Sequence, residues 1–145
     1  MRHILVVDDS EDLLLQYEFS FRSLKYKVTT AQNGDIALAK LESLFLVQEP
    51  VDVVLVDMQI SGAQAIDFIS TLREYGVLIP IIAISLTSNK EMLIELMRRG
   101  CSDFVEKPVS FGELYTRIEE SIKRQCHWYT NTKNRINHYN NRSNS

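Results

Sequence analysis

The sequence predicts an α/β fold in which a parallel sheet of five strands is covered by helices on both faces. Five short apolar, β-branched segments recur along the 145 residues, and each is followed by a segment whose apolar residues have helical spacing. The central apolar segments are almost uninterrupted, which is typical of parallel strands buried on both faces. This alternation of strand and helix indicates a doubly wound (βα)5 sandwich.

The expected strands are short and regularly spaced along the chain. They lie at residues 4–7, 27–31, 51–56, 79–85 and 103–106. The helix after each strand is indicated by apolar residues three or four apart, for example Leu14, Tyr17 and Phe21 after the first strand. The last helix follows the same rule with Leu114, Ile118 and Ile122.

Capping residues agree with this division of the chain. Ser10 precedes an acidic first turn, and Ser110 is followed three residues later by Glu113, which is the pattern of a capping box. Gly76 and Gly100 follow two of the helical segments, where glycine commonly ends a helix. The caps therefore predict the same helix ends as the apolar spacing does.

Composition predicts one globular domain, expected in the cytoplasm. Hydrophobic residues make up 45% and charged residues 24% of the chain, which suits a domain able to bury a core. No apolar stretch reaches the ~18 residues of a membrane span, and the acidic N-terminal segment has no signal-peptide pattern. Cys101 and Cys126 lack the spacing of metal ligands and are interpreted as reduced structural thiols.

The charge is distributed unevenly, with a net value of −3. Residues 1–120 hold all 19 Asp and Glu but only 11 of the 16 Lys and Arg, which argues against nucleic acid binding by the main domain. We therefore place the domain at 1–124 and an Asn-rich basic tail or linker at 125–145, solvated and without a core element, with a partner-binding or nucleic-acid-binding arm as the alternative. Met1 directly before the first strand favours a natural N-terminus.

Several polar residues are expected at one edge of the sheet. Asp8, Asp9, Asp57, Ser85 and Lys107 stand at or just after strand ends, and ligands of such folds bind at the carboxyl ends of the strands. Neighbouring carboxylates ~4 Å apart repel each other by about 4 kcal/mol at an effective dielectric constant near 20, so they need compensation. A hard divalent cation such as Mg²⁺ supplies it, whereas zinc prefers imidazole and thiolate ligands.

A cation at this edge also suits a ligand that contains phosphate. The carboxylate of Asp57 could then attack phosphorus to form an aspartyl phosphate, a known kind of covalent carboxylate chemistry. Lys107 would neutralise charge opposite the metal, so positioning and charge compensation would provide the catalysis.

Four segments together resemble the receiver domain of two-component response regulators, in particular the chemotaxis regulators. They read ILVVDDS at 4–10, VLVD at 54–57, IIAIS at 81–85 and FVEKPVS at 104–110. The resemblance covers residues 2 to about 124. It implies a flavodoxin-like three-layer sandwich with strand order 2-1-3-4-5.

The resemblance also implies a role for each residue of the site. Asp57 would be the phosphoacceptor, Lys107 the lysine that contacts the phosphate, Ser85 the switch hydroxyl and Phe104 the switch aromatic. The Lys107–Pro108 peptide bond would be cis. The metal would be Mg²⁺, which Mn²⁺ could replace. Its ligands would be Asp8, Asp9, Asp57 and the backbone carbonyl of Gln59.

By this resemblance the protein would be a phosphoacceptor that assists its own phosphorylation and dephosphorylation rather than an enzyme. Its partner would be a histidine kinase or a histidine phosphotransfer protein. Residues 89–124 would form the face that switches for partner binding or homodimerisation, with candidate surface charges at Arg98, Arg99, Glu113 and Arg117. Neither a membrane nor nucleic acid is an expected partner of the receiver.

The sequence departs from the family in two places, and other functions stay open. Ser61 and Ala65 occupy the loop after the acceptor where receivers commonly carry a proline and then a glycine, and Phe104 lacks the hydroxyl of the tyrosine often found there. One alternative is a pseudo-receiver that binds partners without phosphorylation. A flavodoxin-like flavin carrier and a phosphatase of the haloacid dehalogenase type are others, although DDSED would repel a flavin phosphate and Gln59 replaces the second aspartate of such phosphatases.

Overall fold

The sheet of the protein is parallel, and its strands follow the order β2-β1-β3-β4-β5. The computed structural model describes residues 1–58, 62–86 and 89–143. The strands are β1 (His3–Val7), β2 (Lys27–Ala31), β3 (Val53–Asp57), β4 (Ile81–Ser85) and β5 (Asp103–Glu106). The helices are α1 (Glu11–Ser23), α2 (Gly34–Leu46), α3 (Gly62–Glu74), α4 (Lys90–Arg99) and α5 (Phe111–Ser143). The predicted flavodoxin-like (βα)5 fold and its strand order are confirmed.

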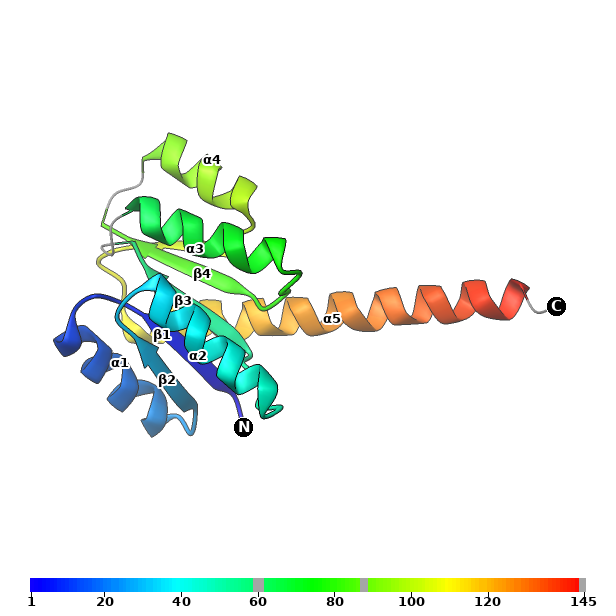
Figure 1. Cartoon of the computed structure of the whole chain (residues 1–145), viewed down its shortest axis with the longest axis horizontal. Coiled ribbons are helices and arrows are strands. Elements are labelled where there is room, and N and C mark those ends of the chain that lie inside the picture. Colours follow the sequence, from blue (N-terminus) through cyan, green and yellow to red (C-terminus); the bar gives the residue numbers. More distant parts are fainter. Residues whose placement is uncertain (59–61, 87–88, 144–145) are drawn as a thin grey trace.

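Helices cover both faces of the sheet, as Figure 1 shows. Helices α2, α3 and α4 lie on one face, where Ala37, Phe68 and Leu96 pack on alternate residues of the strands. Helices α1 and α5 lie on the other, where Phe21 and Ile118 pack on the intervening strand residues. Because both faces of β1, β3 and β4 are covered, every residue of these three strands is buried.

The caps form where the sequence predicts them. The hydroxyl of Ser10 accepts a hydrogen bond from the backbone N–H of Leu13 at 3.3 Å, and that of Ser110 accepts one from the N–H of Glu113 at 3.1 Å. Gly100 ends α4 with φ of 108°, a left-handed conformation that a side chain would strain. A Cβ atom there would also lie 2.6 Å from the Arg73 side chain, so only glycine fits this helix end.

Strand register brings the polar residues of the sequence to one edge. In the β3–β4 ladder Asp57 is opposite Ile84, and the N–H of Met58 donates to the Ile84 carbonyl at 2.8 Å. The N–H of Lys107 donates to the carbonyl of Ser85 at 2.7 Å, so the segment after β5 is fixed beside the end of β4. The carboxyl ends of β3, β4 and β5 therefore meet, as the fold class requires.

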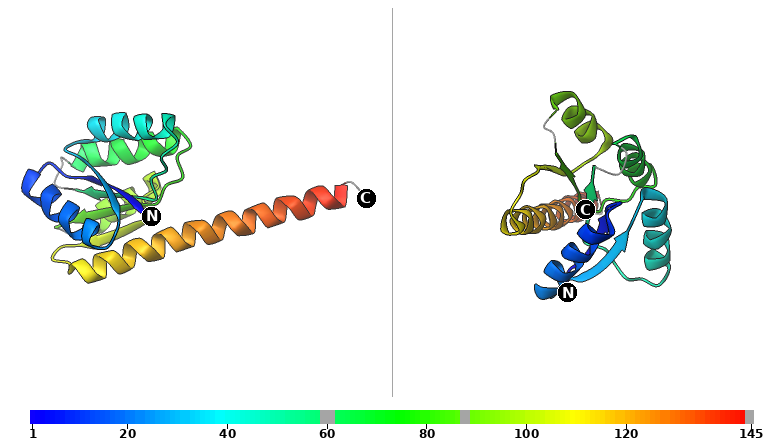
Figure 2. Two further views of the ribbon diagram at one scale, coloured as in Figure 1. Left: turned by 90° about the horizontal axis from the view of Figure 1, so that it is seen from below. Right: turned by 90° about the vertical axis from the view of Figure 1, so that its left-hand side faces the viewer.

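Helix α5 is far longer than the sequence predicted. It continues to Ser143 and projects from the sheet as a single helix, as the two views of Figure 2 show. The composition of 125–145 predicted a solvated segment without a core element, not a helix. The chain carries neither glycine nor proline after Gly112 to end the helix. The side chains of 134–138 and 140–142 are exposed, so these residues add nothing to the core. The boundary at 124 stays a prediction.

None of the described helices is long and apolar enough to cross a lipid bilayer.

Candidate functional site

The candidate site is centred on Asp57, the last residue of β3. Its side chain is 2% exposed, and the Nζ atom of Lys107 donates to Oδ2 at 2.5 Å, with the lysine side chain 16% exposed. Such a shielded pair is only weakly screened by salt. Lys107 reaches the acid from the segment after β5, and the Lys107–Pro108 peptide bond is cis, as expected from the sequence.

Asp8 adds a second buried acid, directly after β1. It is fully buried, and its N–H donates to the carbonyl of Ala31 at 3.0 Å. The Oδ1 atom accepts a hydrogen bond from the N–H of Ser10 at 3.0 Å, whereas Oδ2 has no hydrogen-bond partner among the described residues. Burial raises the pKa of Asp8 to about 7, the Ser10 hydrogen bond opposes this shift, and the neighbouring Asp57 carboxylate increases it.

The structure brings together two of the three predicted acids. Asp8 and Asp57 are close enough for charge and hydrogen bonding to act between them, but the side chain of Asp9 is exposed. Within residues 1–58, 62–86 and 89–143, no three His, Cys, Asp or Glu side chains are grouped to hold a metal ion. The predicted carbonyl ligand, Gln59, lies outside the described residues.

The pair nevertheless fits a hard divalent cation. The unpartnered Oδ2 of Asp8 is a buried oxygen that requires a donor or a cation, since an unpaired buried carboxylate oxygen is costly. Mg²⁺ is commonly bound by one or two carboxylates, with water and substrate oxygens completing its coordination. Two buried carboxylates and one lysine therefore suffice for a site that takes a cation and a phosphate group together.

The two predicted switch residues border this site from adjacent strands. Ser85 ends β4 and is 4% exposed, one residue beyond the partner of Asp57 in the ladder. Phe104 lies opposite Ala83 on β5, is half-buried and packs against the core on the α2–α3–α4 face. The core on this face therefore covers part of Phe104.

Tyr17 belongs to the surroundings of the site, although sequence reasoning had placed it only on an apolar helix face. It lies on α1, half-buried, with its ring stacked 6.4 Å from that of Phe21. Burial raises its pKa to about 12, and the charges of Asp57 and Asp8 contribute to the shift. The phenol therefore stays protonated at neutral pH. A tyrosine at an apolar position carries no signal that distinguishes this location in the sequence.

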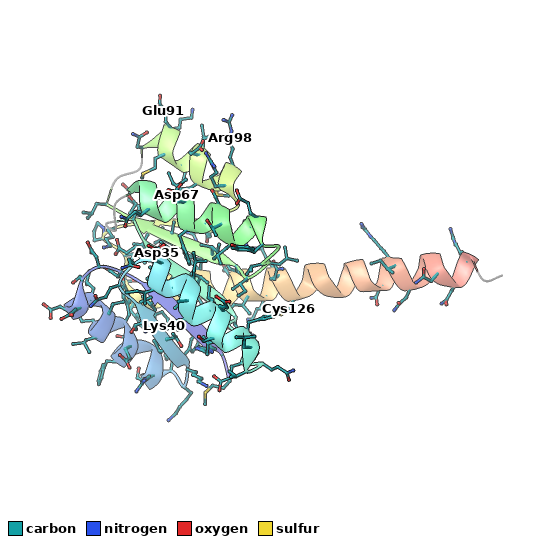
Figure 3. The ribbon with its side chains drawn as sticks, viewed as in Figure 1. Asp35, Lys40, Asp67, Glu91, Arg98 and Cys126 are labelled. Atoms are coloured by element: carbon teal, nitrogen blue, oxygen red, sulfur yellow. The ribbon has the colours of Figure 1, made fainter. Side chains whose placement is uncertain are left out.

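Two of the candidate charges on the predicted output face are already engaged in ion pairs. Arg117, offered by the sequence as a surface charge, instead binds the carboxylate of Asp103 with two hydrogen bonds of 2.7 and 2.6 Å. This pair fixes α5 to β5. Arg99 pairs with Glu95 on the same helix at 2.7 Å, whereas Arg98 extends from α4 toward solvent, as Figure 3 shows.

Comparison with known proteins gives one consistent family. A family model described as the response regulator receiver domain matches residues 4–119. The response regulator SaeR of Staphylococcus aureus is 27% identical over 124 residues, which are 86% of this chain and 52% of SaeR. This chain therefore spans about half the length of the curated relatives it matches.

Solved structures agree with the fold. The receiver domain of Francisella response regulator 1452 is 27% identical with a TM-score of 0.70, covering 86% of this chain and 98% of that one. A receiver domain protein from Clostridium thermocellum has a TM-score of 0.76 at 22% identity, covering 88% and 99%. NtrX from Brucella abortus has a TM-score of 0.80 at 24% identity, covering 92% of this chain and 30% of NtrX. The latter two likenesses concern the fold alone.

The buried carboxyl of Asp8 gives a test by pH in the absence of divalent metal. Its pKa of about 7 in the folded protein lies above the ordinary value of 3.8, so its contribution to the free energy of unfolding falls as pH rises from about 4 to about 7. Asp8→Asn removes this loss, and we expect it to raise the free energy of unfolding by about 1 to 4 kcal/mol at pH 8. Urea denaturation in EDTA measures it, with the exposed Asp9→Asn as control; an Asp8→Asn variant less stable than the wild type at pH 8 would contradict the assignment.

Proposed function

The chain belongs to the response regulator receiver domain family of two-component systems, and from this membership we propose that Asp57 accepts a phosphoryl group in a Mg²⁺-dependent reaction. The donor would be the phosphohistidine of a histidine kinase or of a histidine phosphotransfer protein. The single observation that carries the proposal is the buried Lys107–Asp57 ion pair beside the unpartnered oxygen of Asp8. A pseudo-receiver would have no need to bury this combination of charges.

The chemistry requires little beyond placement and charge compensation. A carboxylate oxygen of Asp57 forms the bond to phosphorus as the bond from phosphorus to the histidine nitrogen of the donor breaks. Lys107, already within hydrogen-bonding distance of Asp57, neutralises charge on the transferred group. The same residues would assist hydrolysis of the aspartyl phosphate, so the protein is a phosphoacceptor that acts on itself rather than an enzyme with a separate substrate.

The metal would be held by Asp8 and Asp57, with Asp9 and the backbone carbonyl of Gln59 as the further contributors that the family resemblance implies. Mg²⁺, or Mn²⁺ in its place, would supply positive charge to the phosphoryl oxygens. Asp9 is exposed at the rim of the site, so we assign it to the water shell of the ion rather than to direct coordination. The proposed location is the cytoplasm, together with the kinase.

The proposed output is a change in the face formed by residues 89–124. The new phosphoryl group attracts the hydroxyl of Ser85, and the space this opens lets Phe104 turn further inward. Because the Phe104 ring is already half-buried, the additional burial contributes less than the roughly 1.5 to 3 kcal/mol of a full aromatic side chain. That is enough to shift a population between two states, which a partner or a second copy then selects.

Phosphorylation should depend on one carboxylate. With Mg²⁺ and acetyl phosphate, the wild-type chain should gain the mass of one phosphoryl group in intact mass spectrometry, and EDTA should prevent the gain. Asp57→Ala should show no gain because the nucleophile is absent, whereas Asp35→Ala, which removes an acid from the first turn of α2, should behave as the wild type does. Equal phosphorylation of Asp57→Ala would refute the assignment.

The switch is tested separately from the chemistry through Ser85→Ala. We expect this variant to be phosphorylated on Asp57, because the hydroxyl is neither nucleophile nor metal ligand. Its change in self-association or partner binding on phosphorylation should be reduced by about tenfold or more, the effect of about 1.4 kcal/mol. Sedimentation velocity with and without acetyl phosphate gives the comparison. A wild-type protein whose association ignores phosphorylation would eliminate the proposed switch.

A further inference from the structure

The part of α5 beyond Cys126 is a helix without a neighbour in Figures 1 and 2. Figure 3 labels Cys126 where α5 leaves the sheet, and from there the helix continues to Ser143. An isolated helix of this length is only marginally stable in water, because most helix stability in proteins comes from the packing of one face. The extension therefore calls for something to pack against it.

Positions at the spacing of a coiled-coil seam can be followed from the core along the extension. Starting from Ile118 and Ile122, which pack in the core, spacings alternate regularly between four and three residues. The positions reached in this way are Gln125, Tyr129, Thr132, Ile136, Tyr139 and Ser143. Three of these positions carry aromatic or apolar side chains, namely Tyr129, Ile136 and Tyr139, and the others are polar. A stripe this narrow suits a two-helix seam rather than a helix on a broad core. Ile136 lies in its middle and is 55% exposed.

The orientation of a partner helix follows from the position of this stripe. It continues the same face of α5 that packs on the sheet through Leu114, Ile118 and Ile122. If two copies paired in parallel on this face, the α5 helix of each copy would have to pass through the space that the sheet of the other copy fills. An antiparallel partner avoids this conflict, because the two sheets then lie at opposite ends of the helix pair.

We propose that the extension of α5 pairs in an antiparallel coiled coil with the same segment of a second copy of this chain. The register that uses the whole extension places Gln125 against Ser143 of the second copy, and Tyr129 against its Tyr139. Ile136 then packs against Thr132 of the second copy, and each contact occurs twice about a twofold axis. The two domains lie at opposite ends of the pair.

Charge supports a copy of this chain as the partner and also predicts a salt effect. Residues 121–145 hold 5 of the 16 Lys and Arg and no Asp or Glu, while residues 1–120 hold all 19 acids. The antiparallel arrangement brings the basic end of each helix, with Arg142, to the acidic domain of the other copy. Lys133 and Arg135 instead face their own counterparts near the axis, a repulsion that salt screens.

Association of the whole chain tests the seam. Sedimentation equilibrium in EDTA without acetyl phosphate should show a dimer in the wild type. Ile136→Glu should weaken dimerisation at least tenfold, since it places a charge in the seam, whereas Asn134→Glu, an exposed position off the stripe, should not weaken it. A wild-type monomer at about 100 µM would overturn the proposal. So would a dimer insensitive to Ile136→Glu, which would point to the face at residues 89–124 instead.

Disulfide cross-linking tests the orientation in a Cys126→Ser background. Gln125→Cys and Ser143→Cys lie at opposite ends of the seam and outside its apolar residues. In the antiparallel pair each engineered cysteine is about 27 Å from its own counterpart, at 1.5 Å per residue. Either variant alone should therefore stay uncross-linked under mild oxidation, and a mixture of the two should give covalent dimers. Cross-linking of a single variant with itself, or none in the mixture, would overturn the antiparallel arrangement.

Discussion

The ion pair between Lys107 and Asp57 is the interaction on which the rest of the site depends. Burying a carboxylate is costly unless a partner compensates the charge, and Lys107 is placed to do so at 2.5 Å. Two features of the fold hold it there: the backbone hydrogen bond from Lys107 to Ser85, and the parallel ladder that brings the ends of β3 and β4 together. The sheet thereby holds Asp57, the proposed nucleophile, at its edge while shielding it from bulk water.

The compensation is incomplete, and that incompleteness indicates function. One lysine faces two buried acids, so Asp8 is left with an unpartnered oxygen and a raised pKa. If these residues served only the stability of the fold, fewer buried charges at this site would give a more stable protein. In the proposed reaction a divalent cation and a phosphate group would stabilise the arrangement together, because the cation would satisfy Asp8 and the phosphate would satisfy Lys107. A resting site destabilised in this way is consistent with the phosphoryl transfer that we propose.

The sequence was sufficient to predict which residues the sheet brings together, because strand ends can be located from apolar runs and parallel strands end at one edge. The positions of Asp8, Asp57, Ser85 and Lys107 follow from that rule. The rule gives the position of a residue along the strand but not the direction of its side chain. It therefore grouped Asp9 with Asp8, although the side chain of Asp9 is exposed and that of Asp8 is buried. It likewise gave no indication that Tyr17 lies near the acids or that Arg117 is bound to Asp103. Composition also gave no indication of the helical extension. Polar residues can continue a helix that has begun on the core when no glycine or proline ends it.

Magnesium titration calorimetry on the unphosphorylated chain tests the central claim, that Asp8 and Asp57 jointly hold a cation while Lys107 opposes it. The account predicts one Mg²⁺ per chain, with affinity at least tenfold weaker in Asp8→Asn and in Asp57→Asn. In Lys107→Met the Mg²⁺ affinity should be higher than in the wild type, because the ammonium group of Lys107 no longer competes with the cation for the Asp57 carboxylate. Unchanged Mg²⁺ affinity in Asp8→Asn, or weaker binding in Lys107→Met, would contradict it.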